Sequence, residues 1–153
     1  MKKTPDGWPR ISSSLFYDDA AQAIDFLCRA FGFEVRLKIE GDGGRIEHSE
    51  LVLGEGLIML STAQKPVKDK RAPSPGRSPR SLGGANTQTL CIFVDDADAH
   101  CERARKAGAR IVDEPMTTDY GEDYWSDRCY RAEDPEGHQW WFMQRLATSG
   151  KPA

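Results

Sequence analysis

Residues 124–142 read YWSDRCYRAEDPEGHQWWF, an aromatic-rich run, a short polar segment and a second aromatic run. The segment Asp134-Pro135-Glu136-Gly137 has the residue types that favour a tight turn, and the flanking runs have the composition of strands. The stretch therefore predicts a β-hairpin. Trp140 and Trp141 are adjacent in its second strand, so their side chains point to opposite faces. We expect one ring to pack on a helix and the other to line a different environment.

The composition is that of an ordinary globular domain. The chain has 153 residues, of which 39% are hydrophobic and 29% are charged, which suits one compact domain with a sizeable core. A net charge of −3 argues against nucleic acid or an anionic membrane as the main partner. No apolar run approaches the length of a membrane span, and the N-terminus lacks the apolar segment of a signal peptide. These features predict a cytoplasmic protein.

The cysteines do not form a metal or redox motif. Their spacing contains no Cys-x-x-Cys pair and no partnered histidine, and in a cytoplasmic chain they are expected to be reduced and to behave as small hydrophobes. The four positions are Cys28, Cys91, Cys101 and Cys129.

The order of expected elements is the same in the two halves of the chain. In the first half a strand is followed by a helix that begins at Asp18-Asp19 and ends near Ala30, before Gly32. In the second half a strand is followed by a helix from Asp95-Asp96 to Gly108. The remaining strands are expected at residues 11–17, 33–39, 45–53, 57–61, 87–94 and 110–113 and in the hairpin, with residues 113–122 irregular.

A shared motif indicates that the two halves are repeats. Asp18-Asp19-Ala20 matches Asp95-Asp96-Ala97 at the start of each helix. An internal repeat of this kind indicates that the same supersecondary unit occurs twice in the fold. The sequence therefore predicts an α+β fold of two tandem βαβββ modules, which form a curved mixed sheet around a cavity with the helices outside. The first module is expected at residues 10–62, a flexible linker at 63–86 and the second module at 87–146.

Three segments of the second half carry a family resemblance. VDDADAH at 94–100, WSDR at 125–128 and DPEGHQWWF at 134–142 resemble the vicinal oxygen chelate superfamily, which includes glyoxalase I, extradiol dioxygenases and bleomycin-resistance proteins. The resemblance is to its glyoxalase/bleomycin-resistance-like branch and covers about residues 10 to 145. It implies the tandem βαβββ fold, a small-molecule ligand and a homodimer, whose modules pair either within one chain or between chains.

The resemblance also implies four metal-ligand positions, two on first strands and two on last strands of the modules. These positions carry Ser12, Met59, Thr89 and Trp141. None of these side chains is a good ligand for a hard or borderline divalent ion. We therefore expect no metal and no cofactor, and metal-dependent glyoxalase or dioxygenase chemistry is not expected.

Strand alternation predicts which side chains face the cavity. The expected set mixes aromatic, thioether and small polar groups, which suits a flat organic ligand; the alternative is that these residues fill a collapsed core. Arg128 is expected either to bind an anionic group at the cavity mouth or to stack on Trp125 or Trp140. The candidate ligand-binding residues are Ser12, Ser14, Phe16, Met59, Thr89, Cys91, Trp125, Arg128, Trp141 and Met143.

His48 and Glu50 form a second candidate site. They are two residues apart on one expected strand, so both side chains point to the same face. Such a pair could act as acid and base; the alternative is a solvent-exposed polar rim. His100 is expected to be exposed on its helix, and His138 is expected to be structural.

The first functional hypothesis is a metal-free protein that binds or sequesters a hydrophobic or aromatic small molecule. The second is a lyase or isomerase of the glyoxalase type that uses a non-standard metal or the pair of His48 and Glu50 as acid and base. The third is a structural or regulatory subunit whose cavity is vestigial.

Overall fold

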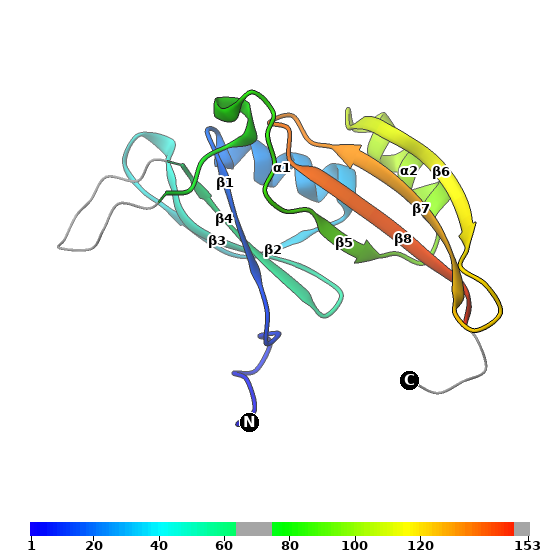
Figure 1. Cartoon of the computed structure of the whole chain (residues 1–153). Coiled ribbons are helices and arrows are strands. Elements are labelled where there is room, and N and C mark those ends of the chain that lie inside the picture. The colour runs from blue at the N-terminus through cyan, green and yellow to red at the C-terminus, as the bar shows by residue number, and fades with distance from the viewer. Residues whose placement is uncertain (64–74, 149–153) are drawn as a thin grey trace. The chain divides into compact units, whose positions relative to one another are not determined.

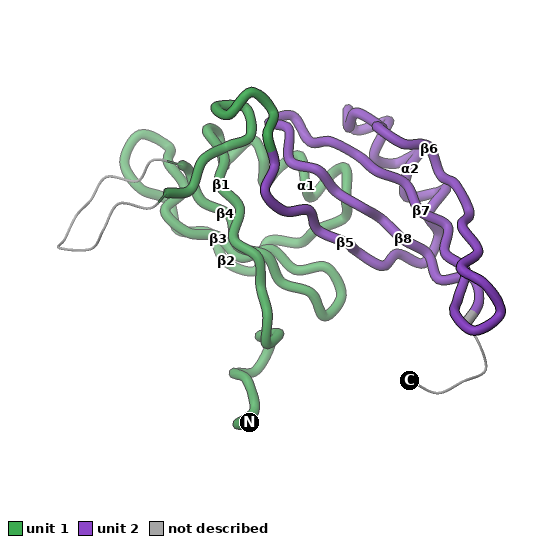
Figure 2. Tube along the Cα trace, in the orientation of Figure 1, with its two compact units in different colours: residues 1–85 green, residues 86–153 purple. Residues whose placement is uncertain are grey.

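The computed structural model describes residues 1–63 and 75–148. Within these residues the chain forms two compact units, residues 1–85 and 86–153 (Figure 2). Each unit contains one α-helix and one four-stranded mixed sheet (Figure 1). The predicted α+β fold with two tandem βαβββ modules is confirmed.

Unit 1 follows the order strand, helix, three strands. Its sheet has the order β1-β4-β3-β2, in which β1 and β4 are parallel and the other pairs are antiparallel. The helix forms because Asp19 accepts a 3.0 Å hydrogen bond from the Gln22 amide, and it ends at Gly32, whose φ of 84° suits glycine. Its elements are β1 (Ser13–Tyr17), α1 (Ala20–Phe31), β2 (Glu34–Glu40), η1 (Asp42–Gly44), β3 (Ile46–Leu53), β4 (Gly56–Thr62) and η2 (Pro79–Leu82).

Unit 2 repeats this arrangement. Its sheet has the order β5-β8-β7-β6, with β5 and β8 parallel, and Asp96 caps its helix by accepting a 2.9 Å hydrogen bond from the Ala99 amide. The predicted hairpin is confirmed as β7 and β8. The elements are β5 (Leu90–Phe93), α2 (Ala97–Lys106), β6 (Arg110–Asp119), β7 (Trp125–Glu133) and β8 (Gln139–Thr148).

The strand register identifies equivalent positions in the two repeats. Ser14 of β1 lies opposite Met59 of β4, and Cys91 of β5 lies opposite Trp141 of β8. Cys91 precedes Asp95 by four residues, as Ser14 precedes Asp18 by four residues. Met59 and Trp141 therefore occupy the same place in their units.

The Asp134 side chain holds the turn between β7 and β8. It is 4% exposed and accepts hydrogen bonds from the amides of Glu136 and His138, at 3.0 and 3.1 Å. Its second oxygen accepts a 3.1 Å bond from the Trp140 indole N–H. The conspicuous aspartate of the hairpin motif therefore joins the turn to the core of unit 2.

The structure corrects two expectations and describes the expected linker only in part. In the stretch 113–122, expected to be irregular, β6 continues to Asp119 and only residues 120–122 lie outside a strand. Pro115 lies within the register shift between Asp113 and Met116, where a strand tolerates a missing amide donor. Of the expected linker, residues 64–74 lie outside the described residues, and the later part includes η2 and the buried Ser78. His100 is half-buried rather than exposed, and its Nδ1 lies 2.5 Å from the Tyr130 hydroxyl.

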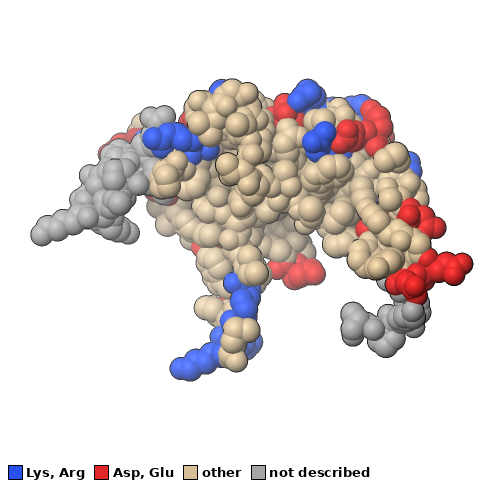
Figure 3. Space-filling model, in the orientation of Figure 1, with Lys and Arg blue, Asp and Glu red and all other residues tan. Residues whose placement is uncertain are grey.

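No helix in residues 1–63 and 75–148 has both the length and the apolar character required to cross a bilayer. Figure 3 shows Lys and Arg on the N-terminal arm of unit 1, and Asp and Glu at the β6–β7 turn of unit 2.

Candidate functional site

The two faces of the unit 2 sheet differ in character. Trp140 and Phe142 are fully buried on the face that packs on α2. On that face the ring centroids of Phe142 and His100 are 4.4 Å apart. The other face of β8 carries Trp141 and Met143, both half-buried. Strand alternation therefore separates the two adjacent tryptophans, one into the core and one onto the opposite face.

Trp141 lies beneath a guanidinium group. Arg131 is its cross-strand neighbour on β7, and the centre of the guanidinium is 5.3 Å from the ring centroid, within the range of a cation–π contact. Asp113 on β6 lies 2.8 Å from Arg131 Nε. The Trp141 ring is thus covered by a planar cation whose charge is balanced by its neighbour.

A second layered contact lies further along the same face, near Asp127. The Arg145 guanidinium is 5.2 Å from the Phe93 centroid and 4.8 Å from the Trp125 centroid. Its Nε donates to Asp127, whose side chain is only 5% exposed. Phe93 and Trp125 remain 57% and 41% exposed, so two aromatic surfaces are open to solvent on either side of a fixed arginine.

Arg128 lies on the opposite face of β7. Its Nε and Nη2 contact the two carboxylate oxygens of Asp98 on α2, at 2.5 and 2.7 Å, and its Nη1 donates to the Thr117 hydroxyl. This hydrogen bonding lowers the pKa of Asp98. The side chain is therefore directed to the helix, and neither of the two roles expected from the sequence describes its contacts.

The unit 1 candidates lie on or near the face of the sheet opposite α1. Ser14 is exposed and Met59 half-buried. Phe16 is half-buried, and Gly76 lies so close to its ring that a side chain at position 76 would collide with it. Ser12 precedes β1, and its buried Oγ has no hydrogen-bond partner among the described residues. Thr89, its counterpart before β5, is exposed.

His48 and Glu50 share the face of β3 opposite α1, because Ser49 and Leu51, which alternate with them, are fully buried. His48 Nε2 lies 3.1 Å from Glu50 Oε1. The other carboxylate oxygen lies 3.1 Å from Arg36 Nε. Glu50 has a side chain that is 8% exposed, so the expected pair is an ion-paired cluster with a buried carboxylate rather than a simple solvent-exposed rim.

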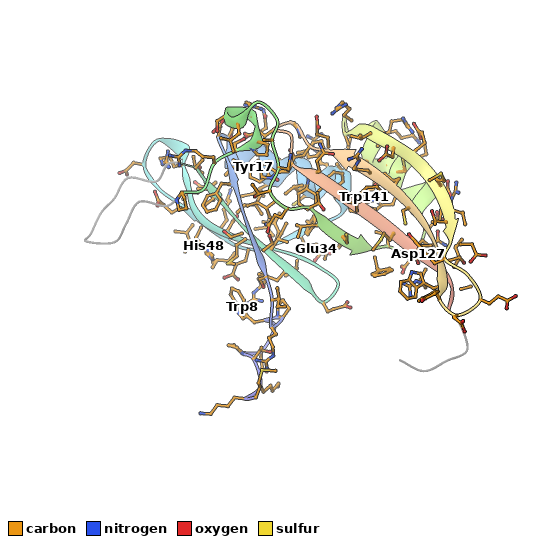
Figure 4. All side chains as sticks on the ribbon, viewed as in Figure 1. Trp8, Tyr17, Glu34, His48, Asp127 and Trp141 are labelled. Carbon is orange, nitrogen blue, oxygen red and sulfur yellow. The ribbon has the colours of Figure 1, made fainter. Side chains whose placement is uncertain are left out.

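The sequence did not reveal two members of this cluster. Arg36 lies at a register shift between Val35 and Leu37, and this bulge brings its side chain to Glu50. Trp8 stacks on the Arg36 guanidinium, with 5.1 Å between the carbon atom and the ring centroid, and the same guanidinium donates to the Gly7 carbonyl. Figure 4 labels Trp8 and His48.

The four family metal positions do not fit a divalent metal ion. A thioether, an indole and two hydroxyls replace the imidazole and carboxylate groups that such an ion prefers. Within residues 1–63 and 75–148, no three His, Cys, Asp or Glu side chains are grouped so that they could hold a metal. The disagreement lies in the donor chemistry, since Trp141 places a ring where a carboxylate is expected.

The cysteines of unit 2 differ in exposure. Cys91 is exposed, beside Trp141 on β5. Cys129 is half-buried, and burial raises the pKa of its thiol. Burial likewise raises the pKa of the Cys101 thiol and of the Cys28 thiol in unit 1. Only the thiolate is strongly nucleophilic, so these three thiols are less reactive than ordinary cysteines.

Comparison with known proteins gives relatives along most of the chain. A Mycobacterium bovis protein described as uncharacterised is 35% identical over 134 residues, which is 86% of this chain and 80% of that protein. A Mycobacterium tuberculosis protein, also described as uncharacterised, is likewise 35% identical over 134 residues. That alignment covers 86% of this chain and 72% of the relative.

Solved structures share the fold. TioX from Micromonospora sp. ML1 is 30% identical with a TM-score of 0.67, covering 91% of this chain and all of that chain. TnmS3 from Streptomyces sp. CB03234, described as an antibiotic binding protein, is 19% identical with a TM-score of 0.59, covering 88% and 93%. The model of the Glyoxalase/Bleomycin resistance protein/Dioxygenase superfamily matches residues 10–142. The chain therefore belongs to the Glyoxalase/Bleomycin resistance protein/Dioxygenase superfamily.

Proposed function

We propose that the protein binds a planar, largely apolar small molecule on the face of the unit 2 sheet opposite α2, and that it does so without a metal ion at the family positions. The observation that carries this proposal is the Trp141 ring beneath the Arg131 guanidinium. The guanidinium that covers this ring is itself planar and stacks on aromatic faces, so the pair favours a flat aromatic ligand through stacking.

The surrounding side chains support the same ligand class. Phe93 and Trp125 leave aromatic surface open to solvent, and exposed apolar groups that gather on one face commonly mark binding sites. Arg131 and Arg145 are each paired with an aspartate. Because their charges are balanced, the site offers stacking surfaces rather than a strong attraction for anions.

The family relationship adds support of a general kind. TnmS3 has the same fold and is described as an antibiotic binding protein, so the fold is compatible with holding an organic molecule. For this chain we propose sequestration of an aromatic compound.

Fluorescence titration of the purified protein with 2-naphthol and 2-naphthoate tests the proposal. Saturable binding of 2-naphthol is expected, and Trp141→Leu should weaken it by about tenfold, which corresponds to roughly 1.4 kcal/mol. Trp8→Leu, which changes a tryptophan of unit 1, is the matched control and should bind normally. Equal binding by Trp141→Leu and the unaltered protein, with both folded by circular dichroism, would overturn the proposal.

A further inference from the structure

The unit 1 face carries a histidine held in one tautomer. Arg36 is a permanent cation and lies 3.1 Å from one Glu50 oxygen, so the Glu50 side chain is a carboxylate and only accepts hydrogen bonds. The 3.1 Å contact from Glu50 to His48 Nε2 then requires the proton to be on Nε2. In neutral His48, Nδ1 therefore carries the lone pair.

That lone pair has no competing partner. Within residues 1–63 and 75–148, the His48 side chain makes a hydrogen bond or ion pair only with Glu50, and it is 36% exposed. An imidazole with one nitrogen bonded to a carboxylate and the other open is the arrangement of a general base with an orienting group. When Nδ1 takes a proton, the adjacent carboxylate stabilises the imidazolium.

The groups around the base are apolar. Leu37 and Ile39 of β2 are the register partners of Glu50 and His48 and are 39% and 47% exposed. Met59 is the partner of Glu50 on β4. A substrate on this face would therefore present apolar surface to these side chains while its acidic proton approaches Nδ1.

We propose that His48 is the general base of a proton-transfer site on unit 1, with Glu50 and Arg36 as positioning residues, and that the site acts on planar, weakly acidic carbon acids whose C–H bond adjoins a C=N or C=O group. All the residues of this site belong to unit 1, and its test does not require ligand binding by unit 2. Trp8 stacks on Arg36 and so helps to fix the guanidinium that holds Glu50.

5-Nitrobenzisoxazole is a suitable probe because its ring opening needs only a base. Nδ1 of His48 takes the proton from C3, and the electrons of that C–H bond form the third bond of a nitrile. The N–O bond breaks and its electron pair leaves on the oxygen, giving the coloured 2-cyano-4-nitrophenolate. No oxidant, reductant or metal enters this balance.

The expected result is a rate for the unaltered protein that exceeds that of His48→Ala by at least about tenfold, since a positioned base typically contributes 100-fold or more. His138→Gln, a histidine change in the β7–β8 turn, is the control and should keep the full rate. Glu50→Gln should lower the rate while the protein stays folded. Equal rates for the unaltered protein and His48→Ala would overturn the proposal.

Nitrogen-15 NMR of the histidine side chains tests the assigned tautomer independently of the ring-opening rate. The unaltered protein should show neutral His48 protonated at Nε2, and Glu50→Gln should mix the two tautomers. Glu50→Asp should recover the single tautomer in part. An Nδ1-protonated imidazole in the unaltered protein would overturn the assigned geometry, whatever the state of ligand binding at Trp141.

Discussion

Glu50 and Arg131 occupy equivalent places in the two repeats and carry opposite charges. Glu50 is the β3 neighbour of Met59, and Arg131 is the β7 neighbour of Trp141. Each is paired with a group of opposite charge from the adjoining edge strand, Arg36 on β2 and Asp113 on β6. In both edge strands the register shifts at this point, so the two repeats hold an ion pair at the same place with opposite polarity.

The opposite polarity of the two ion pairs predicts that the acidic and basic residues of the unit 2 pair, Asp113 and Arg131, can be exchanged. Arg131→Glu should lower the free energy of unfolding by about 1 kcal/mol, because it places a second carboxylate beside the partly exposed Asp113. Adding Asp113→Arg should recover at least half of that loss, since unit 1 already holds the reversed pair on the same strand pattern. Urea denaturation checks this, and a double variant no more stable than Arg131→Glu would contradict it.

Local signals account for most of what the sequence predicts. Asp19 and Asp96 mark the helix starts because their side chains bond the first-turn amides. Alternation placed Trp140 in the core and Trp141 on the other face, since neighbouring strand residues point to opposite sides.

The remaining features depend on contacts that are distant in sequence. Arg36 reaches Glu50 through a bulge, and nothing in the local residue pattern shows where a bulge falls. Alternation shows that Asp127 and Arg128 face opposite sides, but the side taken by each is fixed only when Asp98 of α2 pairs with Arg128. Arg145 lies beyond the quoted hairpin stretch, so its position between Phe93 and Trp125 was missed.

The exposed thiol beside Trp141 predicts ligand-dependent protection. Iodoacetamide should alkylate Cys91 first, because Cys91 is exposed whereas burial raises the pKa of the other three thiols. Saturating 2-naphthol should slow alkylation of Cys91 by several-fold, since the proposed ligand binds on the same face of the sheet, beside this thiol. Mass spectrometry of quenched samples measures each site, with Cys28 of unit 1 as the internal control. An unchanged rate at Cys91 under saturation would place the bound ligand elsewhere.

The pair of Asp127 and Arg145 predicts an asymmetric response to substitution. Arg145→Ala leaves a carboxylate that is only 5% exposed without its partner, which should lower the free energy of unfolding by about 3 kcal/mol. The double change Asp127→Leu with Arg145→Ala removes the buried charge and should be more stable than Arg145→Ala alone. Chemical denaturation of the three proteins checks this order, and the reverse order would show that Asp127 is solvated without Arg145.

The Asp134 turn predicts a large loss of stability from a small change. Asp134→Ala removes the carboxylate that accepts hydrogen bonds from two turn amides and from the Trp140 indole N–H. These three donors then lose this acceptor. The expected cost is about 3 kcal/mol, because buried donors without partners carry their full desolvation penalty. Asp96→Ala, which removes a helix cap, is the comparison and should cost about 1 kcal/mol. Similar losses from the two changes in urea denaturation would mean that water replaces the Asp134 carboxylate.

Glu133 predicts a pH-dependent contribution to stability. Its carboxylate accepts two hydrogen bonds from Arg110, at 2.9 and 2.6 Å, and this contact lowers the pKa of Glu133 in the folded protein. Because the pKa of Glu133 is lower in the folded protein than in the unfolded chain, where it is about 4.3, the ionised carboxylate stabilises the fold at pH values above the unfolded pKa. This stabilisation is lost as the pH falls through the pKa of the folded state. Because Arg110 is 65% exposed, the contribution at neutral pH should be below about 1 kcal/mol.

Arg110→Ala should therefore be less stable than the unaltered protein at pH 7, and the difference should vanish in acid once Glu133 is protonated in both states. Arg110→Lys keeps the charge but loses the paired hydrogen bonds, so its stability at pH 7 should lie between the two. Urea denaturation at a series of pH values measures the differences. If the difference between Arg110→Ala and the unaltered protein persisted unchanged into strong acid, the arginine would be stabilising the fold by packing of its aliphatic part rather than through the Glu133 carboxylate.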